Sequence, residues 1–371
     1  MSRPRTAVGD LLNRAVQAGV VPSAIALWGR PGEPLTREMA GHAQLRPTPR
    51  PPSSDTWYDL ASLTKPLVVG TLTLLAVREG RLQLETTIGE IFNTSTTDAP
   101  VAAATVGQLL SHWSGLPAWR PLYALGTDPE LVVQSVLGIE LSAAPGDRVV
   151  YSCLGFILLG KTLEKIHGAP LQNLFTDRVL RPFKLEDGLG FNVDPLMRTV
   201  AGGSVTAEPE LRMTAEMGYP PSSVPPVGSA TPHDGNARFL GGAAGNSGLF
   251  GTAEGVFRLA SEYVEGAGSL LTASEIEAAT TPVAADLHQV RGLAWQLGMT
   301  PECSAGRRFG PSAFGHVGFT GTSVWVDPSL GGVFVLLTNR CHPDFRDVDL
   351  HPLRRRFHAL AVRDLVSRTA N

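Results

Sequence analysis

Cysteine is scarce in this sequence, with three residues, Cys153, Cys303 and Cys341, among 371. Their odd number, their wide spacing and the lack of any Cys-x-x-Cys pair argue against a disulfide framework and against a cysteine zinc site. The chain also has no His-Glu-x-x-His motif, no phosphate-binding loop and no dinucleotide-binding fingerprint. We therefore expect neither a metal nor a cofactor, and unpaired cysteines fit a reducing compartment.

Long apolar runs are missing too. No stretch reaches the roughly 18 apolar residues that a membrane-spanning helix requires. Residues 1–25 are interrupted by Asp10 and Arg14, so they lack the apolar centre of a signal peptide. These features predict a cytoplasmic protein with no membrane partner.

The sequence has no concentrated positive charge. Its 31 basic and 34 acidic residues give a net charge of −3, and we interpret the densest basic run, residues 354–356, as the solvated face of a helix. We expect no nucleic-acid partner. With 43% hydrophobic and 18% charged residues, the composition is typical of a globular protein with a full core, and nothing in it indicates an oligomeric state.

Hydrophobic periodicity places strands toward both ends of the chain and helices between them. We expect strands over residues 23–28, 38–45, 293–298, 316–326 and 332–338, the last two forming a hairpin. We expect helices over residues 8–18, 106–113, 129–137, 154–166, 171–180, 253–264 and 350–368. Residues 195–251 are rich in proline and then in glycine without regular periodicity, which favours a functional loop or lid.

This order of elements predicts an α+β fold. An antiparallel sheet assembled from both termini would be flanked by helices and would carry an inserted, mostly helical subdomain. We expect residues 1–65 and 236–371 to form the part that contains the sheet, and residues 66–235 to form the helical subdomain. The functional site would lie where the two parts meet.

Ser62 and Lys65 stand three residues apart at a predicted helix start. Side chains at i and i+3 share one helical face, so Lys65 can reach the Ser62 hydroxyl, and the free N–H groups of the first turn favour negative charge. Because a proline in a helix interior costs about 3 kcal/mol, Pro66 indicates that this helix begins no earlier than about Ser62. Taken alone, however, a Ser-x-x-Lys pair is more typical of an ordinary helix start with an exposed lysine.

Two further motifs change this interpretation. Tyr151-Ser152-Cys153 precedes an apolar helix, and His316-Val317-Gly318 opens a strand. Ser-x-x-Lys, Tyr-Ser-x and His-x-Gly, in this order and at these intervals, resemble the serine β-lactamase and penicillin-binding-protein family. The similarity points to its class C type β-lactamase-related hydrolases, which include esterases and D-amino-acid peptidases. It covers nearly the whole chain and implies one β-lactamase-like domain over residues 1–371.

The resemblance implies a role for each motif. Ser62 would be the acylated nucleophile, Lys65 its proton partner and Tyr151 a second acid or base, while the backbone N–H groups of Ser62 and Phe319 would form the oxyanion hole. A lysine can act as a base once burial and a neighbouring cation lower its pKa. The residues implied in substrate binding are Cys153, His316, Val317 and Gly318.

Three of these positions depart from the family pattern. Cys153 replaces an asparagine that often binds a substrate amide, Val317 replaces a threonine, and His316 replaces a lysine that binds a carboxylate. We interpret His316 as a donor that orients substrate, neutral or charged near physiological pH. Cys153 is interpreted as a buried, inert thiol. Residues 233–250 also resemble a family segment and are assigned to the rim of the pocket.

The leading hypothesis is a metal-free serine hydrolase that acts on a small ester or amide through an acyl-enzyme, with esterase activity favoured over efficient β-lactam hydrolysis. A true class C type β-lactamase or a D-Ala carboxypeptidase is the first alternative. From another class, the fold could serve as a non-catalytic ligand-binding module. Ser62, Lys65 and Tyr151 are all present, which argues against this last alternative.

Overall fold

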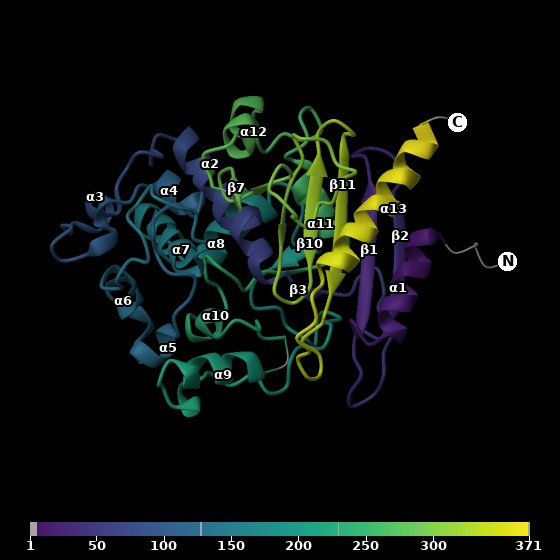
Figure 1. Ribbon diagram of the computed structural model, residues 1–371, viewed down its shortest axis with the longest axis horizontal. Helices are drawn as coiled ribbons and strands as arrows, with labels where there is room; N and C mark the ends of the chain where they lie inside the picture. The colour runs from purple at the N-terminus through teal and green to yellow at the C-terminus, as the bar shows by residue number, and fades with distance from the viewer. Residues whose placement is uncertain (1–5, 127, 229, 287, 370–371) are drawn as a thin grey trace.

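An eight-stranded antiparallel sheet forms the centre of the molecule, in the order β2-β1-β11-β10-β9-β8-β7-β6. The computed structural model describes residues 6–126, 128–228, 230–286 and 288–369. Strands β1 and β2 come from the N-terminal end of the chain, and β6 to β11 come from its C-terminal third (Figure 1). The α+β fold, with a sheet built from both termini, is confirmed.

The strands are β1 (Ser23–Gly29), β2 (Thr36–Gly41), β3 (Tyr58–Asp59), β4 (Leu189–Gly190), β5 (Phe250–Gly251), β6 (Ala284–Ala285), β7 (Val290–Arg291), β8 (Gln296–Leu297), β9 (Phe314–Val317), β10 (Ser323–Asp327) and β11 (Gly332–Thr338). The α-helices are α1 (Ala7–Gln17), α2 (Thr71–Arg78), α3 (Ile88–Phe92), α4 (Val106–Leu110), α5 (Leu122–Leu125), α6 (Val132–Leu137), α7 (Cys153–His167), α8 (Leu171–Phe175), α9 (Glu208–Glu216), α10 (Gly235–Phe239), α11 (Ala253–Ser261), α12 (Ala273–Thr280) and α13 (His351–Thr369). A 3₁₀ turn (Ala61–Leu63) and a π-helical stretch (Lys65–Gly70) precede α2.

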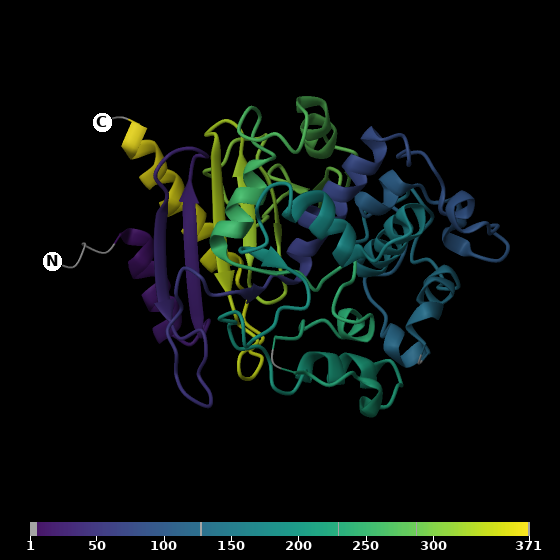
Figure 2. The same cartoon turned by 180° about the vertical axis from the view of Figure 1, so that it is seen from behind.

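Helices cover both faces of the sheet. Helices α1 and α13 lie on one face, and α11 lies on the other, as the views from front and back show (Figures 1 and 2). Every residue of β1 and of β11 is buried, as expected for central strands covered on both faces. Under α1 and α13, Leu12, Trp28 and Phe357 belong to one apolar cluster. The larger cluster joins the opposite face of the sheet to the helices of the middle of the chain.

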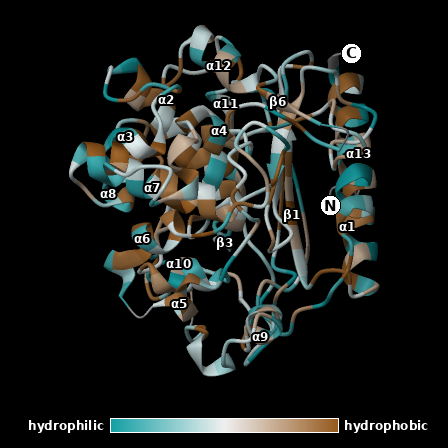
Figure 3. Cartoon of the chain, turned by 60° about the vertical axis from the view of Figure 1, so that its left-hand side comes forward, coloured by the Kyte–Doolittle hydropathy of each residue, from teal (hydrophilic) through white to brown (hydrophobic). Residues whose placement is uncertain are grey.

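The middle of the chain forms a group of helices around α7, which is beside the sheet in Figures 1 and 2. Brown and teal segments alternate in these helices (Figure 3), which is the pattern of helices that bury one face. Nine residues of α7 are buried, so this helix is the centre of the group. The division of the chain after residues 65 and 235 stays a prediction.

One helical run meets the length and composition of a membrane span, which corrects the sequence interpretation. Residues 61–78 form an 18-residue window of mean hydropathy 1.2, and 83% of this window is buried inside the protein. Apolar side chains such as Leu67, Val68 and Leu72 pack in the main core. Core packing therefore accounts for the apolar character of this run.

Several predicted elements differ from the structure. The single strand expected over residues 316–326 is two strands, β9 and β10, because the chain turns back at Gly318, whose N–H donates to the Thr322 carbonyl at 2.8 Å. The segment 195–251, expected to be irregular, contains α9 and α10. Helix α9 was missed because its nine residues have no clear apolar stripe, and because Pro209 at its start and the prolines after it favoured an irregular segment. The hairpin of β10 and β11 is confirmed.

Glycines allow α7 to touch the segment that follows α10. A Cβ built on Gly245 would lie 1.9 Å from the Phe156 carbonyl oxygen, and one built on Gly160 would lie 3.1 Å from the Gly245 backbone. Backbone therefore packs directly on backbone here. Only residues without a side chain allow this approach, and it places the residues after Gly245 next to the N-terminal half of α7.

We predict that Gly245→Ala destabilises the protein, because the new methyl group must displace the α7 backbone. Overpacking of this kind costs at least about 1–3 kcal/mol. Gly203→Ala is the matched control, since a Cβ there meets nothing within 4 Å. Urea unfolding monitored by circular dichroism measures both variants. Equal midpoints for Gly245→Ala and wild type would contradict the prediction.

Candidate active site

Ser62 lies on a strained turn directly after β3. Ala61, the residue before it, has a φ of 48°, in the left-handed region that costs a residue with a Cβ about 1–3 kcal/mol. Two hydrogen bonds hold the turn: the Ala61 N–H donates to Asp59 Oδ1 at 2.9 Å, and Thr64 Oγ1 donates to the Ala61 carbonyl at 2.7 Å. The turn is thus fixed from both sides, and Ser62 lines a cavity.

Lys65 is fully buried beneath Ser62, and its ammonium is surrounded by acceptors. Nζ donates to Ser62 Oγ at 3.0 Å, to the Asn246 carbonyl at 3.0 Å and to Cys153 Sγ at 3.5 Å. The contact predicted from the i, i+3 spacing is therefore formed. No carboxylate forms an ion pair with Lys65 in the described ranges, so a main-chain carbonyl and two neutral side chains hold this buried amine.

The pKa of Lys65 differs from the sequence expectation. Burial lowers it, but electrostatic interactions with Cys153, Tyr151 and Asp234 and a hydrogen bond with Tyr151 raise it, and the balance lies above the usual value. The expected lowering of this pKa is wrong for the resting site. Lys65 is the ammonium there and holds the Ser62 oxygen as a donor.

Tyr151 is positioned by the start of α7. Ser152 caps this helix, accepting from the Gly155 N–H at 3.2 Å, and its own N–H donates to His112 Nδ1 at 3.0 Å. The Tyr151 ring centroid lies 4.4 Å from that of His112 and 5.1 Å from Lys65 Nζ. The helix start and the buried imidazole together place the phenol beside the ammonium.

Cys153 is the first residue of α7 and contributes a thiol to the cavity. Burial raises its pKa, although Lys65 opposes this effect. The residue is therefore a neutral thiol, a weak donor and weak acceptor. It is only partly buried, which corrects the expected full burial, and its inertness stays a prediction.

The turn after β9 lies against the Ser62 turn, and each of the two turns contributes one free N–H group beside the cavity. A Cβ on Gly318 would lie 2.7 Å from the Leu60 carbonyl oxygen, so this backbone lies directly against the Ser62 turn. Thr322 Oγ1 donates to the same Leu60 carbonyl at 3.1 Å. Within the described residues, no hydrogen bond occupies the N–H of Ser62 or of Phe319. Both remain available as the predicted oxyanion donors.

His316 is almost completely buried on β9, and its hydrogen bonding corrects its expected role. Its Nδ1 lies 2.9 Å from the Val317 carbonyl, which only accepts, so the proton is on Nδ1. Burial, with the nearby Arg291 and Lys65 cations, lowers the pKa of His316 well below 6.5. The imidazole is neutral, and its remaining nitrogen is an acceptor rather than the expected donor.

The cavity has a volume of about 590 Å³. The predicted site residues that line it are Ser62, Tyr151, Cys153, His316, Val317, Gly318 and Phe319. Lys65 lies below this surface. The structure therefore brings all predicted residues together, although their chemical roles stay predictions.

Two buried arginines at the cavity were not predicted as site residues. Arg354 is 5% exposed and donates to the carbonyls of Gly318 and Thr322 at 3.0 and 3.1 Å, so it holds the oxyanion turn. Burial lowers its pKa to about 9. The interpretation of residues 354–356 as a solvated face is wrong at this position. Arg291, on β7, lies 5.3 Å from the Tyr151 ring centroid, and no local sequence pattern indicated it.

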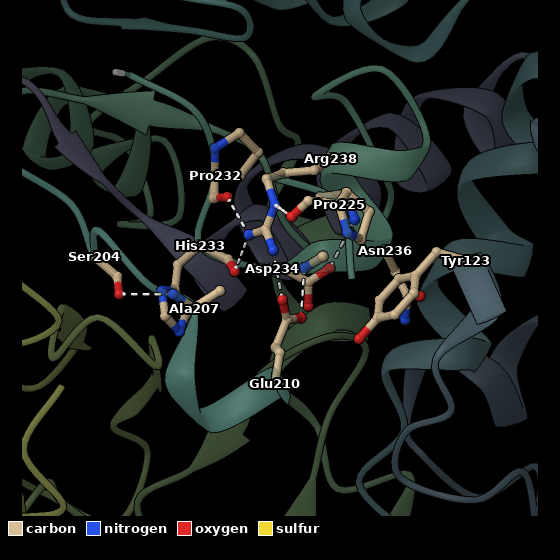
Figure 4. A network of polar contacts seen from close by, with 12 residues as sticks. Tyr123, Ser204, Ala207, Glu210, Pro225, Pro232, His233, Asp234, Asn236 and Arg238 are labelled. Carbon is tan, nitrogen blue, oxygen red and sulfur yellow. Dashed lines mark hydrogen bonds and ion pairs between the residues drawn. The ribbon is translucent and has the colours of Figure 1, made fainter. Parts of the chain in front are cut away.

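The rim of the cavity is held by a polar network around Arg238 (Figure 4). The guanidinium forms an ion pair with Glu210 at 2.7 Å, and both side chains are less than a tenth exposed. It also donates to the carbonyls of Pro225, Pro232 and His233. These contacts fasten α9 and the loop before α10 to each other.

The network continues to the nucleophile turn. The His233 N–H donates to Asp59 Oδ2 at 2.7 Å, and the His233 ring stacks on Phe319 with centroids 5.1 Å apart. Asn246 Nδ2 donates to Asp234 Oδ2 at 3.0 Å. His233 and Asp234 line the cavity, which agrees with the assignment of this segment to the pocket rim.

A family model for Beta-lactamase matches residues 9–359. The chain belongs to the beta-lactamase family. Esterase EstB of Burkholderia gladioli is 27% identical to this beta-lactamase family member over 359 residues, which cover 90% of this chain and 89% of that protein. A "Putative D-alanyl-D-alanine carboxypeptidase" of Escherichia coli O157:H7 is 26% identical over 332 residues, which cover 81% of this chain and 73% of that protein.

Solved structures show the same fold. A penicillin-binding protein homolog from Caulobacter crescentus superimposes with a TM-score of 0.74 at 21% identity, covering 96% of each chain. The named relatives of this beta-lactamase family member are hydrolases, an esterase and a peptidase among them. Among the described residues, no group of three or more His, Cys, Asp or Glu side chains could hold a metal ion.

We predict that Glu210 makes stability depend on pH. Burial, with a smaller effect of Asp234, raises its pKa from 4.5 to about 7 despite Arg238. The native state thus binds this proton more tightly than the unfolded chain. The resulting stabilisation, on the order of 3 kcal/mol, is complete below pH 4.5 and is lost as the pH rises through 7.

Glu210→Gln provides the comparison, because an amide keeps the shape and does not titrate. Urea denaturation at pH 5 and pH 8 measures the free energy of unfolding of both proteins. The free energy of unfolding of wild type minus that of the variant should be larger at pH 5 than at pH 8. Other buried groups titrate in both proteins, so their contributions to the free energy of unfolding cancel when the two proteins are compared. A difference that is the same at both pH values would contradict the prediction.

Proposed function

We propose that this protein is a serine hydrolase that forms an acyl-enzyme on Ser62 and acts on small esters or amides, with esters preferred. The observation that carries the proposal is the 3.0 Å contact between Lys65 Nζ and Ser62 Oγ at the floor of a cavity of about 590 Å³. An alcohol becomes a nucleophile only when its proton has an acceptor and its oxygen is held in place.

The proposed reaction has two stages. Ser62 Oγ attacks the substrate carbonyl carbon while its proton passes to the pair formed by Tyr151 and Lys65, and the positive charge that this proton leaves on the pair stabilises the negative charge that develops. The carbonyl oxygen becomes an oxyanion and accepts hydrogen bonds from the Ser62 and Phe319 N–H groups. The carbon–oxygen bond to the leaving alcohol then breaks, and the alcohol takes the proton from Tyr151.

In the second stage, water replaces the leaving group. It attacks the acyl carbon, gives its proton to Tyr151, and the bond to Ser62 Oγ breaks. Ser62 regains a proton, and the products are one carboxylic acid and the starting enzyme. Atoms balance without any group other than substrate and water.

Two observations support esters as the preferred substrates. Cys153 offers a weakly polar thiol where an amide would need a good donor or acceptor, and EstB, aligned over nine tenths of this chain, is named an esterase. A D-Ala carboxypeptidase is the second candidate. It is supported by the name of the Escherichia coli relative and by the buried Arg291 cation at the cavity.

A fluorophosphonate probe tests the nucleophile directly. We expect one adduct, located on Ser62 by mass spectrometry of peptides, together with turnover of p-nitrophenyl butyrate. Ser62→Ala should lose the label and essentially all turnover. Ser247→Ala is the matched control, because the buried Ser247 also lines the cavity and should leave the adduct in place. Label on Ser247, or on neither serine, would refute the proposal.

Tyr151→Phe tests the proton relay. The variant keeps the ring contacts with His112 and Lys65 but removes the phenol oxygen. We expect kcat to fall about 10²- to 10⁴-fold with little change in KM, as for loss of a general acid or base. Tyr123→Phe, which removes a hydroxyl bonded to Thr214, should keep kcat within about twofold. Similar small effects in both variants would exclude Tyr151 from the relay.

A further inference from the structure

His316 lines the cavity, and its Nε2 is a buried acceptor without a partner among the described residues. Its Nδ1 proton is used by the Val317 carbonyl at 2.9 Å, which leaves the lone pair of Nε2 as the free position of the ring. Nε2 has no hydrogen-bond partner among the described residues, and the side chain is 2% exposed. A buried acceptor without a partner is unfavourable, because it has lost its hydrogen bond to water. A ligand that donates a hydrogen bond would recover this free energy.

The cations around His316 have other partners. Arg291 donates Nε and Nη2 to Gln289 Oε1, at 3.0 and 2.5 Å. Arg354 donates to the Gly318 and Thr322 carbonyls. Neither is hydrogen-bonded to the imidazole. Their positive charge instead disfavours a second proton on the ring, so the acceptor is maintained at neutral pH.

The position of His316 indicates which part of the substrate it meets. Its ring centroid lies 5.9 Å from that of Tyr151, the residue assigned to protonating the leaving group. His316 and Tyr151 line the same cavity as Ser62. For the proposed reaction, this proximity favours the leaving group, rather than the acyl chain, as the part of the substrate nearest His316.

Resting on the proposed hydrolysis, we propose that His316 selects substrates whose leaving group carries a hydrogen-bond donor, a hydroxyl or an N–H group. A leaving group with a methyl group at that place leaves Nε2 unpaired. A carboxylate on the leaving group can only accept hydrogen bonds, as can Nε2, so the two groups repel each other. His316 therefore disfavours substrates with an anionic leaving group.

Three butyrate esters test the proposal. 2-Hydroxyethyl butyrate carries the donor, propyl butyrate replaces its hydroxyl with a methyl group, and carboxymethyl butyrate carries the anion. The acyl-enzyme is the same for all three, so differences in kcat/KM report on acylation. We expect wild type to prefer the hydroxyethyl ester over the propyl ester about 5- to 10-fold, the size of one recovered hydrogen bond.

Variants of His316 show whether this preference depends on the acceptor. His316→Phe keeps an aromatic ring and should reduce the ratio to about one, whereas His316→Gln offers a carbonyl acceptor and should restore part of it. His42→Phe, an exposed position, should keep the wild-type ratio. Each ratio compares two esters on the same variant, so an error in the concentration of folded enzyme cancels. Titration with fluorophosphonate gives the concentration of active enzyme.

The outcomes separate this inference from the proposed function. If Ser62 is labelled and the esters are hydrolysed, but the hydroxyethyl preference is absent or persists in His316→Phe, the role of His316 is refuted and the hydrolase stands. Highest kcat/KM on the carboxymethyl ester refutes it equally. Absence of both label and turnover overturns the hydrolase and this inference together.

Discussion

The site depends on one buried ammonium. Lys65 has no carboxylate to pair with in the described part of the chain, so its charge is balanced by the Asn246 carbonyl, the Ser62 hydroxyl and the groups of α7. A buried charge without such acceptors would cost several kcal/mol. The close approach of Gly245 to α7 is what brings the Asn246 carbonyl within reach. Packing of the helical group is thus linked to Ser62 through the contacts of Lys65.

The site also depends on the hydrogen bonds that attach the sheet to the Ser62 turn. Thr320 and Thr322 donate to the carbonyls of Asp59 and Leu60, and Asp59 in turn accepts from Ala61 and His233. The strained Ser62 turn, the turn after β9 and the rim are therefore connected by hydrogen bonds. A geometry fixed in this way before substrate arrives is what electrostatic stabilisation of an oxyanion requires.

The charge distribution of the cavity separates this protein from the general family pattern. Its third motif contributes a neutral acceptor, His316, while its cations come from β7 and α13 and are held by neutral partners. The chemistry around Ser62 and Lys65 can remain the same while the groups that contact the rest of the substrate change. We therefore expect the walls of the cavity, rather than Ser62 and Lys65, to determine which substrates the proposed hydrolase accepts.

Local patterns in the sequence determined the fold class, most helices and strands, and the three motifs, because periodicity and i, i+3 spacing are short-range properties. They placed Ser62 against Lys65 correctly, since both lie within one helical turn. The raised pKa of Lys65, the acceptor role of His316 and the burial of Arg354 were decided only by the tertiary structure. Each of these depends on groups that lie far away in the chain, such as Tyr151, Arg291 and Gly318. The desolvation and the charges that shift a pKa arise only when the fold brings those groups together.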